Sequence, residues 1–295
     1  MDNLVNTNKI IRKKFSNLTL LGNKNKNKYS RAKPFPHIVL DNFFNTQYLN
    51  SVHSEFPDLS KSKKTKNYIN INEIKLANND FKKFPKKIKN IINFLNSKKF
   101  IKFLQNITSI NENLIADTSL SGGGLHEIKK GGVLKIHTDF NRHPVLKLDR
   151  RINLLLYLNK EWKKKYGGNL EFWNQEMKQC KKRVLPIFNR MVIFSTTDFS
   201  NHGHPQPLNC SKDKSRKSIA IYYFSKGRPK SEIKDIYQKN TTLFKNRANI
   251  QNDVFVKNEK IKKFLRSFKF YHSLKNFEKK YLRIGKSIKK SLKSI

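Results

Sequence analysis

The stretch LHEIKKGGVLKIHTDF, residues 125–140, decides the fold. Its second part, GGVLKIHTDF, is a short apolar run that follows two glycines, which is typical of a β-strand entered from a turn. His137 and Asp139 lie two positions apart near the end of this run. Because residues i and i+2 of a strand project from the same face, we expect an imidazole and a carboxylate to point toward one place.

Short apolar runs separated by turn residues continue on both sides of this stretch. They are LIADTSL, RINLLLYLN, GGNLEFW, RVLPIF, MVIFS and KSIAIYYFS, all between residues 114 and 225. About seven strands of this length favour a β-sandwich or barrel over a βαβ fold. The sequence therefore predicts a mostly β core with flanking helices.

Helical patterns flank this core. KPFPHIVLDNFF, from residue 33, predicts a strand over His37–Leu40, with Asp41 as the cap of a helix that Pro57 ends. Residues 83–108 carry apolar residues at helical spacing, and they predict two helices with a break near Asn96 and Ser97.

The chain divides into four predicted parts. They are a basic flexible tail (1–32), an N-terminal strand with supporting helices (33–113), the β core (114–228) and a basic helical C-terminal extension (229–295). In the extension, apolar residues recur at helical spacing from residue 261 to residue 292, which predicts an amphipathic helix or helix pair. Within the second part, SKSKKTKN (60–67) is expected to be a surface loop.

The net charge is +42, from 63 Lys and Arg against 21 Asp and Glu. A balance this basic is typical of proteins that bind nucleic acids or anionic surfaces. However, the excess is mostly Lys and accompanies abundant Asn, Ile and Phe, the residues of A/T-rich codons. No nucleic-acid-binding motif accompanies it, so we favour compositional drift and treat nucleic acid as a partner that the charge allows but does not indicate.

Several classes of protein are disfavoured. No run of about 18 apolar residues is present, so no transmembrane segment is expected. The first residues, MDNLVNTNKIIRKKF, lack the apolar core of a secretory signal. Two cysteines, Cys180 and Cys210, cannot form a disulfide scaffold and suit a reducing compartment. We expect a cytoplasmic protein of unknown oligomeric state.

A second histidine completes a candidate metal site. His202 lies in SNHGHPQPL, directly after the apolar run MVIFS. Two histidines and one carboxylate form the set that binds non-haem Fe(II) and leaves positions open for a 2-oxo acid and O₂. His204, two residues further on, is an alternative to His202 as the ligand. His126 and Glu127 precede the first ligand strand and are candidates for the wall of the co-substrate pocket, but we favour a surface turn for them.

Two further residues are candidates for binding the acid. Arg216 begins the run RKSIAIYYF shortly after the His202 loop, and its guanidinium offers a planar, permanently charged fork for a carboxylate. Tyr157, in NLLLYLN, has a hydroxyl that can donate to the same carboxylate.

In these motifs, from residue 125 to residue 224, the sequence resembles the Fe(II)/2-oxoglutarate-dependent dioxygenases, and within them the prolyl 4-hydroxylase-like branch. The matching features, in order, are HTD, RINLLLYLNKEW, GGNLEFW, NRMVIF, HGHPQPL and RKSIAIYYF. The resemblance implies a double-stranded β-helix, or jelly roll, packed by N-terminal and C-terminal helices. It implies His137, Asp139 and His202 as iron ligands, and Arg216 with Tyr157 as the anchor of 2-oxoglutarate.

The resemblance also implies an oxidoreductase that hydroxylates a substrate while 2-oxoglutarate is decarboxylated to succinate. Its cofactors would be Fe(2+), 2-oxoglutarate and O₂, with ascorbate as a reductant. The substrate would be a peptidyl or free proline-like residue or another small molecule. Two alternatives remain open: a non-enzymatic jelly-roll binding module, and a nucleic-acid-directed oxygenase.

Overall fold

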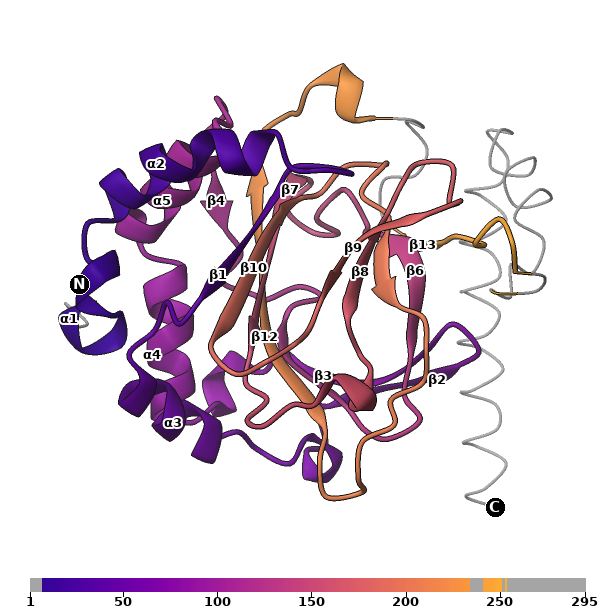
Figure 1. Ribbon diagram of the computed structural model, residues 1–295. Coiled ribbons are helices and arrows are strands. Elements are labelled where there is room, and N and C mark those ends of the chain that lie inside the picture. The colour runs from indigo at the N-terminus through magenta and orange to yellow at the C-terminus, as the bar shows by residue number, and fades with distance from the viewer. Residues whose placement is uncertain (1–6, 234–240, 251–252, 254–295) are drawn as a thin grey trace, which may run out of the picture. The chain divides into compact units, whose positions relative to one another are not determined.

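A curled antiparallel sheet dominates the computed structural model, which describes residues 7–233, 241–250 and 253 (Figure 1). The strands in this part of the chain are β1 (His37–Asp41), β2 (Lys66–Asn70), β3 (Glu73–Asn78), β4 (Ile115–Ala116), β5 (Gly124–Ile128), β6 (Leu134–Thr138), β7 (Asp149–Tyr157), β8 (Leu170–Trp173), β9 (Cys180–Val184), β10 (Arg190–Ser195), β11 (His202–His204), β12 (Arg216–Ser225) and β13 (Leu243–Phe244). Their spatial order is β1-β10-β7-β12-β5-β3-β6-β11-β8-β9, with β2 beside β3, β4 beside β12 and β13 beside β6. The mostly β jelly-roll prediction is confirmed.

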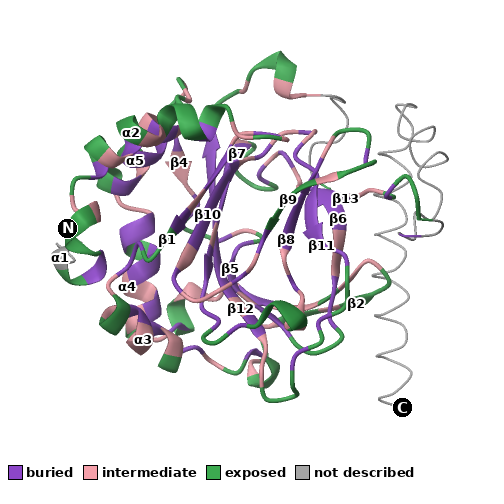
Figure 2. Cartoon of the chain, viewed as in Figure 1, coloured by how far each residue is buried: buried purple, intermediate pink, exposed green. Residues whose placement is uncertain are grey.

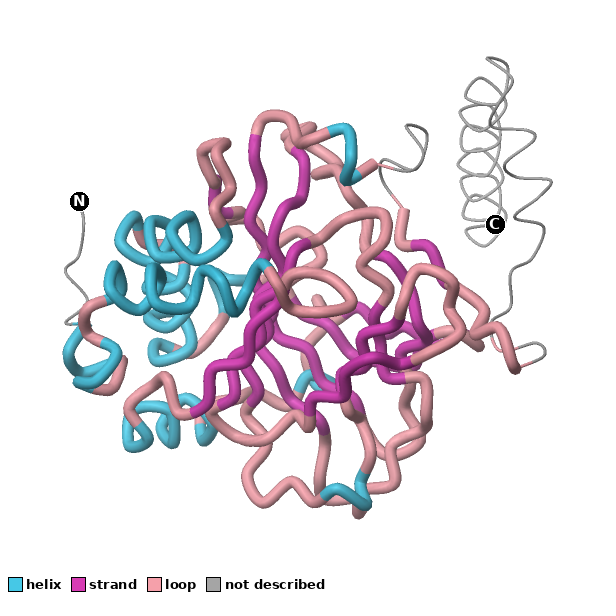
Figure 3. The backbone as a smooth tube through the Cα atoms, turned by 45° about the horizontal axis from the view of Figure 1, so that its top comes forward, coloured by secondary structure: helices cyan, strands magenta, loops and turns pink. Residues whose placement is uncertain are grey.

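Helices cover the outer face of the strands β1, β10, β7 and β12 (Figures 1 and 3). The helices in the described residues are α1 (Thr7–Ile10), α2 (Leu18–Ser30), α3 (Thr46–Ser54), α4 (Lys86–Leu95) and α5 (Lys98–Thr108). The predicted break in 83–108 is confirmed, because Ser97 separates α4 from α5 and its Oγ accepts from the amide of Phe100 at 3.3 Å. None of the helices in this part of the chain is long and apolar enough to cross a membrane.

Strict alternation along β7 separates the structural side of the sheet from its functional side. Ile152, Leu154 and Leu156 belong to the core shared with the helices. The alternate residues point the other way: Asn153 donates to Asp139, and Tyr157, which follows Leu156, packs in a second core inside the curled sheet. Figure 2 shows how both sides of this sheet region are buried. The two-residue period of a strand thus gives one segment two different surroundings.

The prediction of a flexible tail over residues 1–32 is wrong for the part that the structure describes. Residues 18–30 form α2, capped by the Asn17 side chain, which accepts from the amide of Leu20 at 3.0 Å. Leu18, Gly22 and Tyr29 are buried. The polar run KNKNK lies on the exposed face of this helix, so its composition concealed a helix stabilised by tertiary packing.

Two smaller expectations also differ from the structure. Asp41 is the last residue of β1 and pairs with Arg190 at 2.6 Å, whereas the cap of α3 is Asn45. The expected loop 60–67 ends in β2, which forms a hairpin with β3. The predicted strand at 37–40 is confirmed as part of β1. The C-terminal helical pattern of 261–292 lies outside the described residues.

Candidate active site

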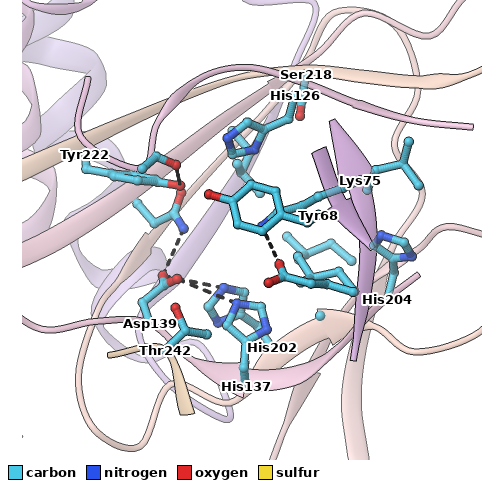
Figure 4. A pocket seen from close by; sticks show the side chains of 18 of the residues that line it. Tyr68, Lys75, His126, His137, Asp139, His202, His204, Ser218, Tyr222 and Thr242 are labelled. Carbon is cyan, nitrogen blue, oxygen red and sulfur yellow. Dashed lines mark hydrogen bonds and ion pairs between the residues drawn. The ribbon is translucent and has the colours of Figure 1, made fainter. Parts of the chain in front are cut away.

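Two neighbouring strands place both predicted histidines together. His202 of β11 is paired directly with His137 of β6. Their ring centroids lie 4.5 Å apart, and the ligand atoms of His137, His202 and Asp139 all lie within 4.8 Å of one another (Figure 4). Residues 65 positions apart in the sequence therefore meet because β6 and β11 pair in this register.

The close pairing depends on Gly203. A Cβ atom built there would lie 2.7 Å from the backbone oxygens of both Leu134 and Lys135. A side chain at this position would push β11 away from β6. The register also shifts between His202 and His204, which is a β-bulge, and His204 consequently faces Leu134 rather than the group of three.

The two imidazoles present the same nitrogen to the site. Nδ1 of His137 donates to the carbonyl of Lys135, and Nδ1 of His202 donates to the carbonyl of Ser200, each at 2.8 Å. The Nε2 atoms then carry lone pairs and lie 3.6 Å and 3.5 Å from the Asp139 carboxylate oxygens. Burial lowers the pKa of His202 to about 4, so the ring is neutral near pH 7. Neutral rings oriented by backbone carbonyls are the form in which histidine binds metals.

Asp139 is held by two donors on one of its oxygens. Arg150 and Asn153 donate to Oδ2 at 2.8 Å and 3.1 Å. Burial works to raise the pKa of Asp139, but the Arg150 guanidinium, with the two histidines, outweighs it and holds that pKa well below its usual value. The carboxylate is therefore charged, and Oδ1 is the atom left for a metal. The donor set of two Nε2 atoms and one carboxylate oxygen fits Fe(II).

The sequence did not reveal Arg150. Its guanidinium carbon lies 3.4 Å from the centroid of the Tyr222 ring and 4.6 Å from that of Phe140. These aromatic contacts fix the guanidinium beside Asp139. The only signal in the sequence was an Arg in a chain whose cations are mostly Lys, at the start of an apolar strand.

Arg216 lines another part of the same cavity and contacts Tyr157 behind it. Arg216 donates to the Tyr157 hydroxyl at 3.0 Å and to the carbonyl of Gly168 at 2.9 Å. Arg216 is buried, yet among the described residues no carboxylate forms an ion pair with it. Burial raises the pKa of Tyr157 although Arg216 opposes this, so the hydroxyl keeps its proton. The pair offers positive charge and donors to an anion.

The cavity between these groups has a volume of about 190 Å³. Its wall includes Tyr68 and Lys75 from the β2–β3 hairpin, which the sequence patterns did not predict (Figure 4). Asn residues at 67, 70 and 72 hid the alternation of this hairpin. On another side, Thr242 lines the cavity and the ring of Phe244 lies 5.6 Å from that of His137.

Two more histidines line the cavity away from the group of three. His126 belongs to β5 and not to a surface turn, and burial, followed by the nearby Lys75, lowers its pKa to about 3. Burial and the proximity of Arg216 lower the pKa of His204 well below its usual value. Both rings are therefore neutral at physiological pH.

Residues 123–224 match the family described as the 2OG-Fe(II) oxygenase superfamily. This chain carries a 2OG-Fe(II) oxygenase domain. The match includes all five predicted site residues, which are His137, Asp139, Tyr157, His202 and Arg216. The superfamily that the sequence predicts is confirmed over these residues, and its description names iron and 2-oxoglutarate, two of the predicted cofactors.

Curated relatives of the oxygenase domain are named prolyl 3-hydroxylase OGFOD1. The Xenopus laevis protein is 25% identical over 196 residues, which are 64% of this chain and 35% of that protein. The Mus musculus protein is 25% identical over 197 residues, which are 65% of this chain and 33% of that protein. The chain thus spans about a third of the length of these relatives.

A solved structure has the same fold. It is a prolyl hydroxylase from Trichoplax adhaerens in complex with a peptide fragment of the hypoxia inducible factor oxygen degradation domain. Its TM-score is 0.52 at 18% sequence identity, and the match covers 72% of this chain and 92% of that chain.

Proposed function

We propose that this chain hydroxylates a peptide substrate, with a proline residue as the first target to test, in a reaction that depends on Fe(II) and 2-oxoglutarate. In the balanced reaction, 2-oxoglutarate, O₂ and a substrate C–H bond give succinate, CO₂ and a C–OH group. The observation that carries the proposal is a single cavity with two features. It holds a group of two histidines and one carboxylate, and it holds a buried arginine with which no carboxylate of the described residues forms an ion pair. A cytoplasmic setting suits the two free cysteines.

His137, Asp139 and His202 are the proposed ligands of the iron. Bound iron would supply the activation of O₂ that the side chains cannot perform. The residues of the chain do the rest: backbone carbonyls orient the two rings, and Arg150 and Asn153 hold Oδ2 of Asp139 so that Oδ1 is presented. Three protein ligands leave further positions open for reactants.

Arg216 and Tyr157 are the proposed anchor of the distal carboxylate of 2-oxoglutarate. A charge in a buried site is costly unless a partner neutralises it. Arg216 has no such partner among the described residues, and a dicarboxylate that extends from it toward the metal ligands would provide one. Tyr157 keeps its proton and donates to the same carboxylate.

The hairpin and the last described strand support a substrate larger than a free amino acid. Tyr68 and Lys75 form part of the wall near the metal ligands, and Ile69 and Ile71 beside them are 71% and 58% exposed. On another side, β13 pairs with β6 and carries Phe244 next to His137. Apolar side chains around the cavity suit contacts with the flanking residues of a peptide. The names of the curated relatives support proline as the residue modified.

The test is turnover of 2-oxoglutarate by the full chain with Fe(II) and ascorbate. We expect succinate in amounts equal to the hydroxylated product when proline-containing peptides are screened by mass spectrometry, with a gain of one oxygen atom. The Asp139→Ala variant is the control and should form no succinate. Absence of 2-oxoglutarate binding in the presence of iron would contradict the proposal and favour a binding module.

A further inference from the structure

The helical layer formed by α1, α2, α4 and α5 has charge of a single sign. Residues 7–40 and 81–111, which contain these helices, hold 17 Lys and Arg and no Asp or Glu. Since 21 of the 84 charged residues of the whole chain are acidic, 17 charged positions of average composition would include about four acids. In contrast, residues 112–233 hold 11 acids and 23 Lys and Arg. The two segments therefore contribute +17 of the net charge of +42, without a single acid.

The fold brings the two segments into one surface. A Cβ atom on Gly22 of α2 would lie 2.9 Å from Cβ of Asn106 of α5, so these helices pack in close contact. Figure 1 shows α2 and α5 side by side, and the two helices are in direct contact. Their cations project outward, since the following are exposed: Lys24, Lys26, Lys28, Lys98, Lys99 and Lys102.

The side chains of these cations lack acidic partners among the residues that the structure describes. None of the 17 forms an ion pair within the part of the chain that the structure describes. Of the acids that flank the layer, Glu55 accepts from the backbone amide of Lys87 and not from its ammonium group, and Asp80 pairs at 3.3 Å with Lys64, which lies outside the layer. Compositional drift toward Lys explains the cations but not the absence of Asp and Glu from one layer.

We infer that this helical layer is a docking surface for the phosphate backbone of a nucleic acid. Clustered Lys residues bind phosphates without reading the base sequence, and the exposed amides of Asn23, Asn27 and Asn93 add donors for phosphate oxygens. A membrane surface fits less well, because helices that enter lipid expose apolar side chains. Here the apolar residues of α2, α4 and α5 face the core, and Leu20 is the one large apolar side chain exposed among the described residues of these helices.

The surface is separate from the cavity. β7 and β12 lie between them, with Leu154 and Ile219 directed to the helices and Asn153 and Arg216 lining the cavity. Nucleic-acid binding would therefore hold the protein near a target while the cavity stays free. This inference does not rest on the proposed oxygenase reaction.

The experiment measures binding of the full chain to a labelled single-stranded RNA of mixed sequence, and to DNA of the same sequence, over a range of salt concentrations. Both are about 24 nucleotides long, so that they can extend along a surface that binds the phosphate backbone. The layer variant replaces Lys24, Lys26, Lys28, Lys98, Lys99 and Lys102 with Gln. The control variant makes the same change at six exposed lysines outside the layer: Lys163, Lys164, Lys165, Lys212, Lys226 and Lys230. Circular dichroism checks that both variants fold.

We expect the layer variant to bind at least about tenfold more weakly at about 100 mM salt, and the control variant to weaken by less than about threefold. Each phosphate interaction that the substitutions remove should reduce the slope of log K against log salt by roughly 0.7, so the layer variant should show a shallower slope. Equal weakening in the two variants, or no binding by the wild-type chain at about 50 mM salt, would overturn the inference. So would layer-dependent binding to phosphatidylserine vesicles without binding to RNA or DNA.

Discussion

Two arginines line the same cavity and differ in what neutralises them. Arg150 is 1% exposed and pairs with Asp139 at 2.8 Å. Arg216 is 5% exposed and, within the described residues, contacts a hydroxyl and a carbonyl but no carboxylate. Because an unpaired buried charge is costly, the first arginine belongs to the protein's own architecture, and the second is complete only with an anionic ligand.

This difference in pairing distinguishes two roles of arginine that the sequence alone does not distinguish. Arg150 orients a metal ligand, and its removal should affect both metal binding and folding. Arg216 binds a co-substrate, and its removal should affect co-substrate affinity while the empty protein is unharmed. Variants at these residues and at their partners test this difference between the two arginines.

The largest effect is expected for Asp139→Ala. This change removes one of three proposed metal ligands and leaves Arg150 buried without a partner. Succinate formation should fall by more than about 100-fold, because even residues behind a metal ligand contribute roughly 10- to 100-fold. The measurement is succinate released per enzyme with saturating Fe(II). The double variant Asp139→Ala/Arg150→Met, which removes both charges, should recover stability but not activity; wild-type turnover by either variant would refute the ligand assignment.

Arg150→Met should give the next largest effect. It leaves the Asp139 carboxylate buried without its cation, and breaking a buried pair costs about 3–5 kcal/mol. We expect a lower Tm of the metal-free protein and about 10- to 100-fold weaker Fe(II) binding. Differential scanning fluorimetry and metal titration measure these. Arg150→Lys keeps the charge but loses the planar stacking on Tyr222, and it should fall between the two; an unchanged Tm for Arg150→Met would contradict the architectural role.

This contrast also marks what sequence patterns can and cannot predict. His137 and Asp139 could be found because a strand brings positions i and i+2 to one face, and Arg216 because it begins a recognisable apolar run. Arg150 and Tyr68 could not, since their roles depend on contacts with Asp139 and with the cavity that only the sheet register creates. Long-range pairing leaves no local pattern.

The helices show the same limit in another form. The break near Ser97 was predictable from a local cap, whereas α2 was not predictable from its polar composition. Its buried Leu18, Gly22 and Tyr29 have meaning only against α5 and the sheet. Tertiary packing stabilises that helix more than the propensity of its residues does.

Arg216→Met should change co-substrate binding and spare the empty protein. We expect the KM for 2-oxoglutarate to rise about 10- to 100-fold, since a charge-assisted contact contributes about 1.5–3 kcal/mol. The Tm of the ligand-free variant should equal or exceed that of the wild type, because an unpaired buried charge has been removed. Steady-state kinetics and fluorimetry test both halves. A Tm as low as that of Arg150→Met would abolish the contrast between the two arginines.

Tyr157→Phe removes one hydroxyl from the Arg216 side and leaves the guanidinium in place. One neutral hydrogen bond contributes about 1 kcal/mol, so the KM for 2-oxoglutarate should rise about fivefold with little change in kcat. The matched control is Tyr222→Phe, whose hydroxyl donates to the carbonyl of Gly122 at 3.0 Å instead of contacting Arg216. An equal rise in KM for both variants would show that Tyr157 has no specific role in holding the carboxylate.

The smallest effect concerns His126, which lies in the field of both arginines. Burial, then Lys75, with Arg216 and Arg150 contributing, lowers its pKa from 6.5 to about 3. The unfolded chain therefore binds a proton at this residue at higher pH than the folded chain does, so its stability contribution is complete above pH 6.5 and is lost as the pH falls toward 3. Replacement with Gln should reduce this pH dependence. Between about pH 7 and pH 4, the Tm of metal-free His126→Gln should therefore fall less than the Tm of the metal-free wild type. The two decreases should differ by about 2–4 °C for each 1 kcal/mol of linked stability. His53→Gln, at a half-buried histidine away from the cavity, is the control. Parallel Tm profiles for wild type and His126→Gln would mean that burial and the neighbouring cations do not lower the pKa of this ring in the folded chain.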